Sequence, residues 1–350
     1  MIHMYDVLVI GAGQAGLAAG YYLKQSGLTF LIVDAGRSIG QSWRNRYDSL
    51  QLFTPRMYDE LPGMQLEGDR HGLPSKDEIA DYFEKYAEQM QLPIMLNCAI
   101  TRLSIEDEVY YAETTAGTIT ARDVIIATGP FQVKNVPSFA NSLSEEIVQL
   151  HSSEYKNRSQ LVPGTTVVAG GGNSGAQIAV ELASDDRQIV YISLARQITF
   201  KPLHIMKRSI FWYLEKNGLL RAGTERMKGK WLRNQPEYVY GYELKELIAK
   251  GRVNMRPRVT NAIGDRILYE DGSETRVNNI IWATGFQRND RWIDVQNAFD
   301  SDRGVLHEGG VSPVAGLYFV GLPWQTSRGS ALLGWVKYDA ESIVHAVLQR

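Results

Sequence analysis

Residues 5–16 read Tyr-Asp-Val-Leu-Val-Ile-Gly-Ala-Gly-Gln-Ala-Gly, and this stretch decides the fold. The apolar, β-branched run Val7–Ile10 predicts a strand, and residues 17–24 predict a helix. The pattern G-x-G-x-x-G lies between them. Gly11 permits a tight turn, Gly13 leaves room for a pyrophosphate against the backbone, and Gly16 lets the helix pack on the strand. The stretch therefore predicts a dinucleotide-binding turn.

Two further features support this interpretation of the turn. Gln14 and Ala15 stand just before the predicted helix, where free N–H groups and the helix dipole favour phosphate. A second apolar run, residues 28–33, predicts the next strand and ends at Asp34. This acid follows the glycines by about 20 residues, the spacing at which a carboxylate holds a ribose hydroxyl.

The composition is that of an ordinary soluble globular protein. Of the 350 residues, 44% are hydrophobic and 22% charged, and the formal net charge is −2. This balance provides no electrostatic attraction for nucleic acid or for a membrane, and we expect neither as a partner. The length predicts two domains. No pattern distinguishes a monomer from a dimer.

The cysteine and histidine content limits the redox and metal chemistry that we expect. Cys98 is the single cysteine, which excludes a redox dithiol pair within the chain and suits a reducing compartment. It lies in the predicted strand 92–98, and we expect a packed core thiol. The six histidines are scattered without metal-ligand spacing, so we expect no metal site.

The N-terminus and the hydropathy pattern predict a cytoplasmic location. Residues 1–4 leave no room for the basic region and apolar core of a signal peptide before the first predicted strand. No run of about 18 apolar residues is present, so we expect no membrane span.

A second glycine pattern begins after the predicted strand 165–169. It comprises Gly170, Gly172 and Gly175, and it places Asn173 and Ser174 at the start of another predicted helix. No acid ends the strand that follows. Arg196 stands just beyond it, and this cation either pairs with a 2′-phosphate or is an exposed surface charge; the sequence leaves both open.

The chain also repeats a short turn downstream of each glycine pattern. Ala127-Thr128-Gly129 and Ala283-Thr284-Gly285 each end a predicted apolar strand, and their small residues allow close approach to a nucleotide. We therefore predict an α/β protein with two Rossmann-like dinucleotide-binding domains, the second inserted into the first. The expected boundaries are residues 1–156, 157–286 and 287–350.

Two segments suggest how bound groups are covered. The loop 36–44, which contains Gln41 and Trp43, suits closure over a flat ring system, although an ordinary turn with one packed tryptophan is the alternative. The segment 198–258 is rich in aromatic and basic residues. We interpret it as a helical lid over the nicotinamide and substrate rather than as a single-strand nucleic-acid surface.

The paired glycine patterns, the loop Gly40–Trp43 and both Ala-Thr-Gly turns resemble those of class B flavoprotein monooxygenases, in particular the small bacterial flavin-containing monooxygenase-like proteins. The resemblance covers essentially the whole chain. The family fingerprint, F-x-G-x-x-x-H-x-x-x-W/F/Y, matches at His151 and Tyr155. Glu145 and Ile147 replace its phenylalanine and glycine.

The resemblance implies cofactors and a reaction. FAD would occupy the first domain, near Gly321, and NADPH, or NADH as well, the second. Reduced flavin would react with O₂ to a C4a-(hydro)peroxide that transfers one oxygen atom to sulfur, nitrogen or a ketone carbon of a small substrate. The alternatives are a flavin-dependent NAD(P)H reductase or oxidase that oxygenates nothing, and a redox-sensing accessory protein.

Two residues are candidates for a catalytic role. His151 is the polar candidate, with a structural hinge as its alternative role. Phe53 occupies the place where larger relatives have an asparagine beside the flavin, and this replacement favours the reductase alternative.

Overall fold

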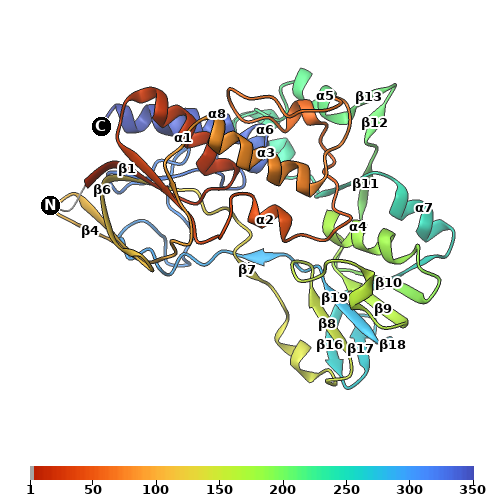
Figure 1. Cartoon of the computed structure of the whole chain (residues 1–350). Helices are drawn as coiled ribbons and strands as arrows, with labels where there is room; N and C mark the ends of the chain where they lie inside the picture. Colours follow the sequence, from red (N-terminus) through yellow and green to blue (C-terminus); the bar gives the residue numbers. More distant parts are fainter. Residues whose placement is uncertain (1–3) are drawn as a thin grey trace.

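The computed structural model describes residues 4–350 and has a mixed α/β architecture, as the sequence predicts (Figure 1). The first sheet has the strand order β3-β2-β1-β6-β5-β4, and β21 also pairs with β6. Its parallel strands are β1 (Met4–Ile10), β2 (Phe30–Val33), β3 (Ile94–Met95), β6 (Gly117–Ile126) and β21 (Leu317–Phe319). Strands β4 (Ile100–Glu106) and β5 (Val109–Thr114) form an antiparallel extension on β6.

Alternation along β1 divides the core of this part into two layers. Val7 and Val9 face a cluster built with the helices, whereas Leu8 and Ile10 face a cluster that includes the antiparallel strands. The helices on the first face are α1 (Gln14–Ser26), α3 (Lys76–Gln89) and α8 (Val336–Leu348). A capping box between Ser75 and Glu78 begins α3, because each side chain accepts a hydrogen bond from the other residue's backbone N–H.

The second sheet is wholly parallel and has the order β15-β10-β9-β19-β8. Its strands are β8 (Val148–His151), β9 (Gly164–Ala169), β10 (Gln188–Leu194), β15 (Val253–Pro257) and β19 (Asn279–Trp282). Helices α4 (Asn173–Leu182) and α7 (Glu243–Ala249) pack with it, and a small antiparallel sheet comprises β16 (Val259–Ile263), β17 (Arg266–Tyr269) and β18 (Glu274–Arg276). All of these elements lie in the chain between β6 and β21 of the first sheet.

The chain passes between the two sheets along one paired connection. Strands β7 (Val133–Lys134) and β20 (Phe286–Gln287) run antiparallel, so the outgoing and returning segments lie side by side (Figure 1). The second sheet therefore begins before the boundary predicted at residue 156, because β8 already belongs to it. The half-exposed pattern of β8 contains no continuous apolar run, and for this reason the sequence did not mark it as a strand.

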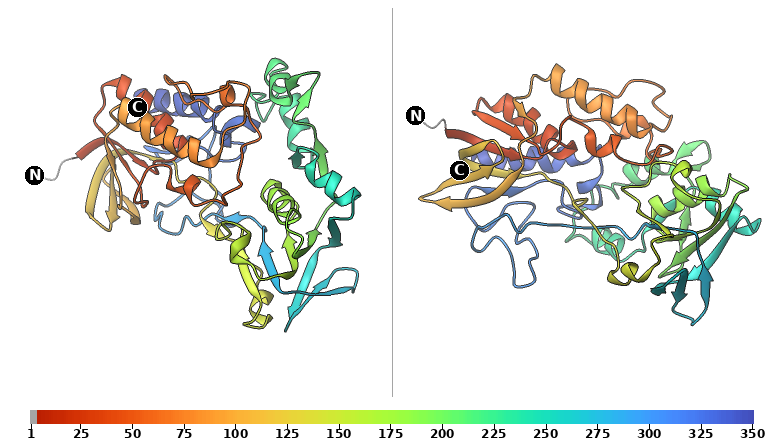
Figure 2. Two further views of the ribbon diagram at one scale, coloured as in Figure 1. Left: turned by 45° about the vertical axis from the view of Figure 1, so that its right-hand side comes forward. Right: turned by 60° about the horizontal axis from the view of Figure 1, so that its bottom comes forward.

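The predicted lid is shorter than expected. Residues 243–257 form α7 and β15, which complete the parallel sheet, and only the part before them is a separate insertion. That insertion contains β11 (Thr199–Lys201), β12 (His204–Ile205), β13 (Arg208–Ser209), α5 (Ile210–Lys216), α6 (Met227–Arg233) and β14 (Tyr238–Tyr240). The two views in Figure 2 show it extending from the second sheet toward the helices of the first.

Several short helices complete the fold, and one strand is shorter than the sequence predicts. The short helices are α2 (Gln41–Arg44), η1 (Arg56–Tyr58), η2 (Ser138–Ser142), η3 (Arg158–Gln160) and η4 (Arg328–Ala331). The strand expected over residues 92–98 is only Ile94–Met95, because Asn97 adopts a positive φ of 54° and turns the chain. Cys98 is buried in the core as expected.

Aromatic stacking joins the insertion to the first part of the fold. The ring of Phe53 stacks on Phe211 of α5 and Tyr240 of β14, with centroid separations of 5.9 and 4.8 Å. Trp335, which is 4% exposed, packs in the same cluster and donates from its indole nitrogen to Glu215 at 2.7 Å. The insertion is therefore held on the first part by buried aromatic surface.

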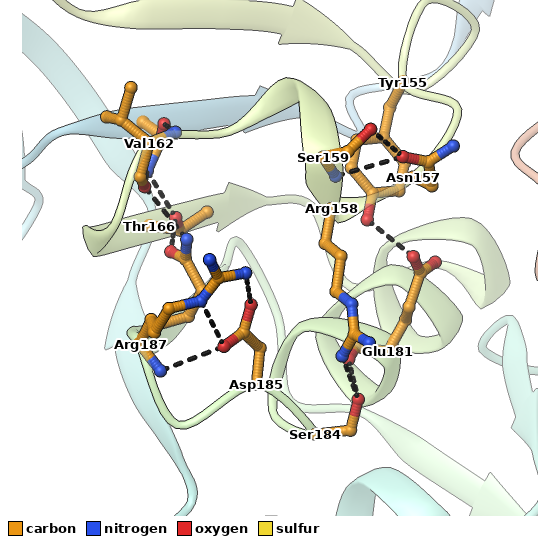
Figure 3. Close-up of polar contacts among 12 residues, drawn as sticks. Tyr155, Asn157, Arg158, Ser159, Val162, Thr166, Glu181, Ser184, Asp185 and Arg187 are labelled. Carbon is orange, nitrogen blue, oxygen red and sulfur yellow. Dashed lines mark hydrogen bonds and ion pairs between the residues drawn. The ribbon is translucent and has the colours of Figure 1, made fainter.

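Polar contacts join Tyr155, in the segment that follows β8, to helix α4 of the second sheet (Figure 3). The hydroxyl of the buried Tyr155 donates to Glu181 at 3.0 Å, and Ser49 donates to the other carboxylate oxygen of Glu181. Figure 3 also shows Arg187 pairing with Asp185 through two side-chain hydrogen bonds of 3.0 and 2.8 Å. The fingerprint tyrosine thus has a structural contact with helix α4, which packs on the second sheet.

Candidate functional site: two cavities that meet

The first glycine turn has the close packing that its pattern requires. Gly11 has a φ of 111°, and a Cβ there would lie 2.6 Å from the carbonyl oxygen of Ala127. A Cβ on Gly16 would lie 1.8 Å from the carbonyl oxygen of Gly11. A Cβ on Gly13, by contrast, would meet nothing within 4 Å. Two glycines are therefore required for packing, and the third opens onto free space at the start of α1.

That free space belongs to a cavity of about 720 Å³. Asp34 borders it and is held firmly, because its two carboxylate oxygens accept hydrogen bonds from the backbone N–H groups of Ala12 and Gly36, both at 2.7 Å. Of the residues predicted for the first cofactor, the following line this cavity: Gly11, Gly13, Gln14, Ala15, Asp34, Trp43, Ala127, Thr128, Gly129 and Gly321. Gly16 lies beneath the turn, and the side chain of Gln41 instead accepts from the backbone N–H of Arg37 at 2.6 Å.

The second glycine turn repeats the first in detail. Gly170 has a φ of 129°, and a Cβ there would lie 2.1 Å from the carbonyl oxygen of Ala283. A Cβ on Gly175 would lie 2.1 Å from the carbonyl oxygen of Gly170, whereas one on Gly172 would meet nothing within 4 Å. In each turn, the first glycine packs against the alanine of an Ala-Thr-Gly sequence. This contact explains why the two motifs occur together in the chain.

The second turn opens onto a cavity of about 870 Å³. The residues predicted for the second cofactor that line it are Gly170, Gly172, Asn173, Ser174, Gly175, Ala283, Thr284 and Gly285. Arg196 does not line it and is exposed, although its neighbour Ala195 does. Arg258, which the sequence analysis did not select, lines this cavity. Asn173 also anchors the insertion, since its side chain donates to the carbonyl of Tyr238 at 3.0 Å.

The two cavities share one wall, so they meet. Both are lined by Gln14, Trp43, Arg46, Phe131, Phe286 and Ala331. The guanidinium carbon of Arg46 lies 5.0 Å from the ring centroids of both Phe131 and Phe286. Within residues 4–350, no carboxylate forms an ion pair with Arg46. A half-buried cation without a counter-ion suits a site that binds an anion. No local sequence pattern distinguishes this arginine from the others.

The two candidates for catalysis lie in different surroundings. His151 is 1% exposed, and its ring nitrogens lie 2.9 Å from the carbonyl oxygen of Gly285 and 2.8 Å from the hydroxyl of Ser153. Burial lowers the pKa of His151, and its side chain lines neither cavity. Phe53 lines the larger cavity as part of the aromatic cluster. These contacts suit a structural role for His151 and an apolar wall for Phe53.

A buried acid lines the larger cavity near Phe53. Asp59 is 1% exposed, and both of its carboxylate oxygens lie within hydrogen-bond distance of the Thr54 hydroxyl, at 2.6 and 2.7 Å. Burial raises the pKa of Asp59 well above its usual range. The hydrogen bond from Thr54 lowers this pKa by less than burial raises it, and the proximity of Glu60 raises it further. Sequence reasoning missed this residue, because an acid between Tyr58 and Glu60 carries no sign that it is buried.

None of the helices within residues 4–350 has the length and apolarity needed to cross a membrane. Over the same residues, no three His, Cys, Asp or Glu side chains come together as a metal site would require.

The fold and the paired cavities define a nucleotide-dependent oxidoreductase. The family model for pyridine nucleotide-disulphide oxidoreductases matches residues 8–209, and the chain belongs to this family. Both predicted cofactors are those of the family, which depends on FAD and NAD(P)H. The expectation of an enzyme related to class B flavoprotein monooxygenases is confirmed.

One relative in sequence and two solved structures are similar to this chain over nearly their whole length. The chain is 50% identical over 348 residues to "Uncharacterized oxidoreductase CzcO-like" of Geobacillus kaustophilus, an alignment that covers 99% of each protein. Its structure is similar to that of a flavin-containing monooxygenase from Stenotrophomonas maltophilia, with a TM-score of 0.82, 25% identity, and coverage of 100% of this chain and 99% of that one. An ornithine N-hydroxylase from Kutzneria, solved with reduced FAD, NADP⁺ and L-ornithine, shares the fold at 16% identity, with a TM-score of 0.75 and coverage of 99% and 100%.

Proposed function

We propose that this chain is an FAD- and NADPH-dependent monooxygenase that transfers one oxygen atom from O₂ to the sulfur, nitrogen or ketone carbon of a small organic substrate. The observation that carries the proposal is the meeting of two cavities, each opening from its own glycine turn. FAD, when bound, supplies the acceptor for the NADPH hydride and the site of reaction with O₂.

The lining residues of each cavity support a proposal for which cofactor binds there. FAD occupies the smaller cavity, with its pyrophosphate at the open position of Gly13 and its ribose at Asp34. NADPH occupies the larger cavity, with its pyrophosphate at Gly172 and the start of α4. Residues 1–156 and 287–350 thus contribute the FAD-binding part, and residues 157–286 the NADPH-binding part, apart from the early start of the second sheet at β8.

The chain itself brings the cofactors together and excludes water. Gln14, Trp43 and Ala331 of the shared wall would hold the reactive end of FAD beside the nicotinamide. The aromatic cluster around Phe53 keeps water from the larger cavity, which favours oxygen transfer over loss as peroxide. The disulfide chemistry in the family description is not open to this chain acting alone, because Cys98 is its single cysteine.

Product analysis tests the proposal. The purified, FAD-loaded protein is supplied with NADPH, O₂ and, in turn, a thioether, an amine and a ketone. We expect oxygenated product from at least one class to account for a substantial share of the NADPH consumed. If all reducing equivalents emerge as hydrogen peroxide with every class, the protein is an oxidase. Negligible NADPH consumption would instead indicate a redox-sensing accessory protein.

A further inference from the structure

The Thr54–Asp59 pair takes no part in the ion pairs that its charged neighbours form. Both residues are at least nine-tenths buried, at 5% and 1% exposed, and both line the larger cavity. The charged neighbours of Asp59 are engaged elsewhere, since Arg56 pairs with Glu78, and Glu60 pairs with Arg70. Within residues 4–350, no cation forms an ion pair with Asp59.

The geometry of the pair suits a neutral carboxyl group. The Thr54 hydroxyl has one hydrogen, yet it lies 2.6 and 2.7 Å from the two oxygens of Asp59. Both contacts can be hydrogen bonds only if the carboxyl group is protonated. The Thr54 hydroxyl then donates to one oxygen of Asp59, and the protonated oxygen of Asp59 donates to the Thr54 hydroxyl. Burial without a counter-ion favours the same protonated form, because the carboxylate would have to leave water unpaired.

The packing places this acid beside a segment that reaches both cavities. The segment 331–334 lies directly against it: a Cβ on Gly334 would fall 1.8 Å from the carbonyl oxygen of Tyr58 and 3.4 Å from the backbone nitrogen of Asp59. Ala331, in the same segment, lines both cavities, and its carbonyl oxygen accepts from the side chain of Gln14 at 3.0 Å. Asp59 therefore lines the larger cavity beside the segment whose Ala331 also borders the smaller one.

We propose that Asp59, held by Thr54, is the proton donor for oxygen transfer; this inference rests on the proposed monooxygenase function. The reaction converts NADPH, O₂, one proton and the substrate to NADP⁺, water and the oxygenated product. The O–O bond breaks, one oxygen atom forms a bond to the substrate atom, and the other leaves as water. Asp59 delivers the proton to the departing oxygen and is reprotonated from solvent through the cavity.

Infrared spectroscopy tests the protonated acid without turnover. The FAD-loaded wild type is compared with Asp59→Asn, which preserves the size and neutrality of the side chain. We expect the difference spectrum at neutral pH to contain the carbonyl band of a protonated carboxyl group, shifted in D₂O. Other buried acids cancel in this difference. Absence of the band would overturn the proposal.

The amount of product formed per NADPH consumed tests the role of Asp59 as proton donor. General acid catalysis contributes roughly 10²–10⁴-fold, so in Asp59→Asn we expect product formed per NADPH to fall at least about tenfold and peroxide to rise correspondingly. Anaerobic reduction of the flavin by NADPH should stay within about twofold of wild type. Glu88→Gln is the control, because it neutralises an exposed carboxylate of α3 that lines neither cavity, and we expect wild-type coupling.

The outcomes separate the inference from the function on which it rests. Wild-type coupling in an FAD-loaded Asp59→Asn would overturn the role of Asp59 and leave the monooxygenase function standing. A wild type that yields peroxide alone with every substrate class would overturn the function, and the proton-donor role with it.

Discussion

Gly13 and Gly172 are equivalent residues that face different cavities, and this equivalence permits a reciprocal test. Both have ordinary negative φ values, −81° and −77°, and a Cβ at either position meets no protein atom within 4 Å. A valine is therefore tolerated by the fold at both positions and obstructs only what binds there. We expect Gly13→Val to purify without FAD, and Gly172→Val to retain FAD but lose its reduction by NADPH.

The measurements are the visible spectrum of each purified variant and its anaerobic titration with NADPH. Each variant serves as the folding control for the other, since the helix N-terminal position is the same. Normal FAD content in Gly13→Val would contradict the assignment of the smaller cavity, and normal reduction of Gly172→Val that of the larger one.

We expect any preference for NADPH over NADH to depend on a cation near the end of β10. Arg196 was selected from the sequence and is exposed, whereas Arg258 lines the larger cavity. A charge-assisted bond to the 2′-phosphate contributes up to about a hundredfold in affinity. We expect Arg196→Ala to lower the NADPH/NADH ratio of kcat/KM, and Arg258→Ala to be the matched comparison. If only the second variant changes the ratio, Arg258 is the phosphate ligand and Arg196 a surface charge.

At the scale of elements, the aromatic contact between α5 and the first part of the fold packs the insertion against Phe53, which lines the larger cavity, and we infer that it helps to exclude water there. Phe211 is 1% exposed and stacks on Phe53. We expect Phe211→Ala to lower the free energy of unfolding by roughly 3–5 kcal/mol and to raise the fraction of NADPH lost as peroxide, because water enters. Urea denaturation and peroxide assay measure the two effects.

Trp231→Ala is the control for that substitution. Trp231 lies in the same insertion and is 56% exposed, so its removal should change stability by no more than about 0.5 kcal/mol. An effect on peroxide formation as large as that of Phe211→Ala would contradict the assignment of the closing contact to α5.

Elements built on local patterns could be predicted from the sequence, and those that depend on distant contacts could not. The turns at Gly11 and Gly170 carry their own strand, glycines and helix, so their packing follows from a short stretch. Strand β8 was missed because it is defined by pairing with β19, more than a hundred residues later. The burial of Asp59 depends likewise on segment 331–334, which no pattern near residue 59 contains.

At the scale of the whole molecule, the two sheets are joined by more than the paired connection of β7 and β20. The hydroxyl of the buried Tyr47 donates to Gln177 of α4 at 2.8 Å, and Ser49 and Tyr155 converge on Glu181 of the same helix. The loop that follows Trp43 thus bridges from the smaller cavity to the helix that begins at the second glycine turn. This arrangement fixes the spacing between the cavities at their shared wall.

Stability as a function of pH reflects the buried acids of the molecule. Asp339 in α8 is 3% exposed, and burial raises its pKa, which the hydroxyls of Thr326 and Ser330 only partly offset. A carboxyl group whose pKa is higher in the folded than in the unfolded state destabilises the fold increasingly as pH rises from the unfolded pKa through the folded one. Asp339→Asn removes this effect, so we expect the variant to gain stability relative to wild type as pH increases.

Urea denaturation of both proteins between pH 5 and pH 9 measures this slope. Asp185→Asn is the control, because hydrogen bonds from Arg187 lower the pKa of Asp185 to about 2, and this carboxylate is ionised in the folded and the unfolded states over that whole range. Its substitution should therefore give a stability difference that does not change with pH. A pH-independent difference for Asp339→Asn as well would mean that Asp339 is ionised in the native protein, with solvent reaching the carboxylate oxygen that has no hydrogen-bond partner.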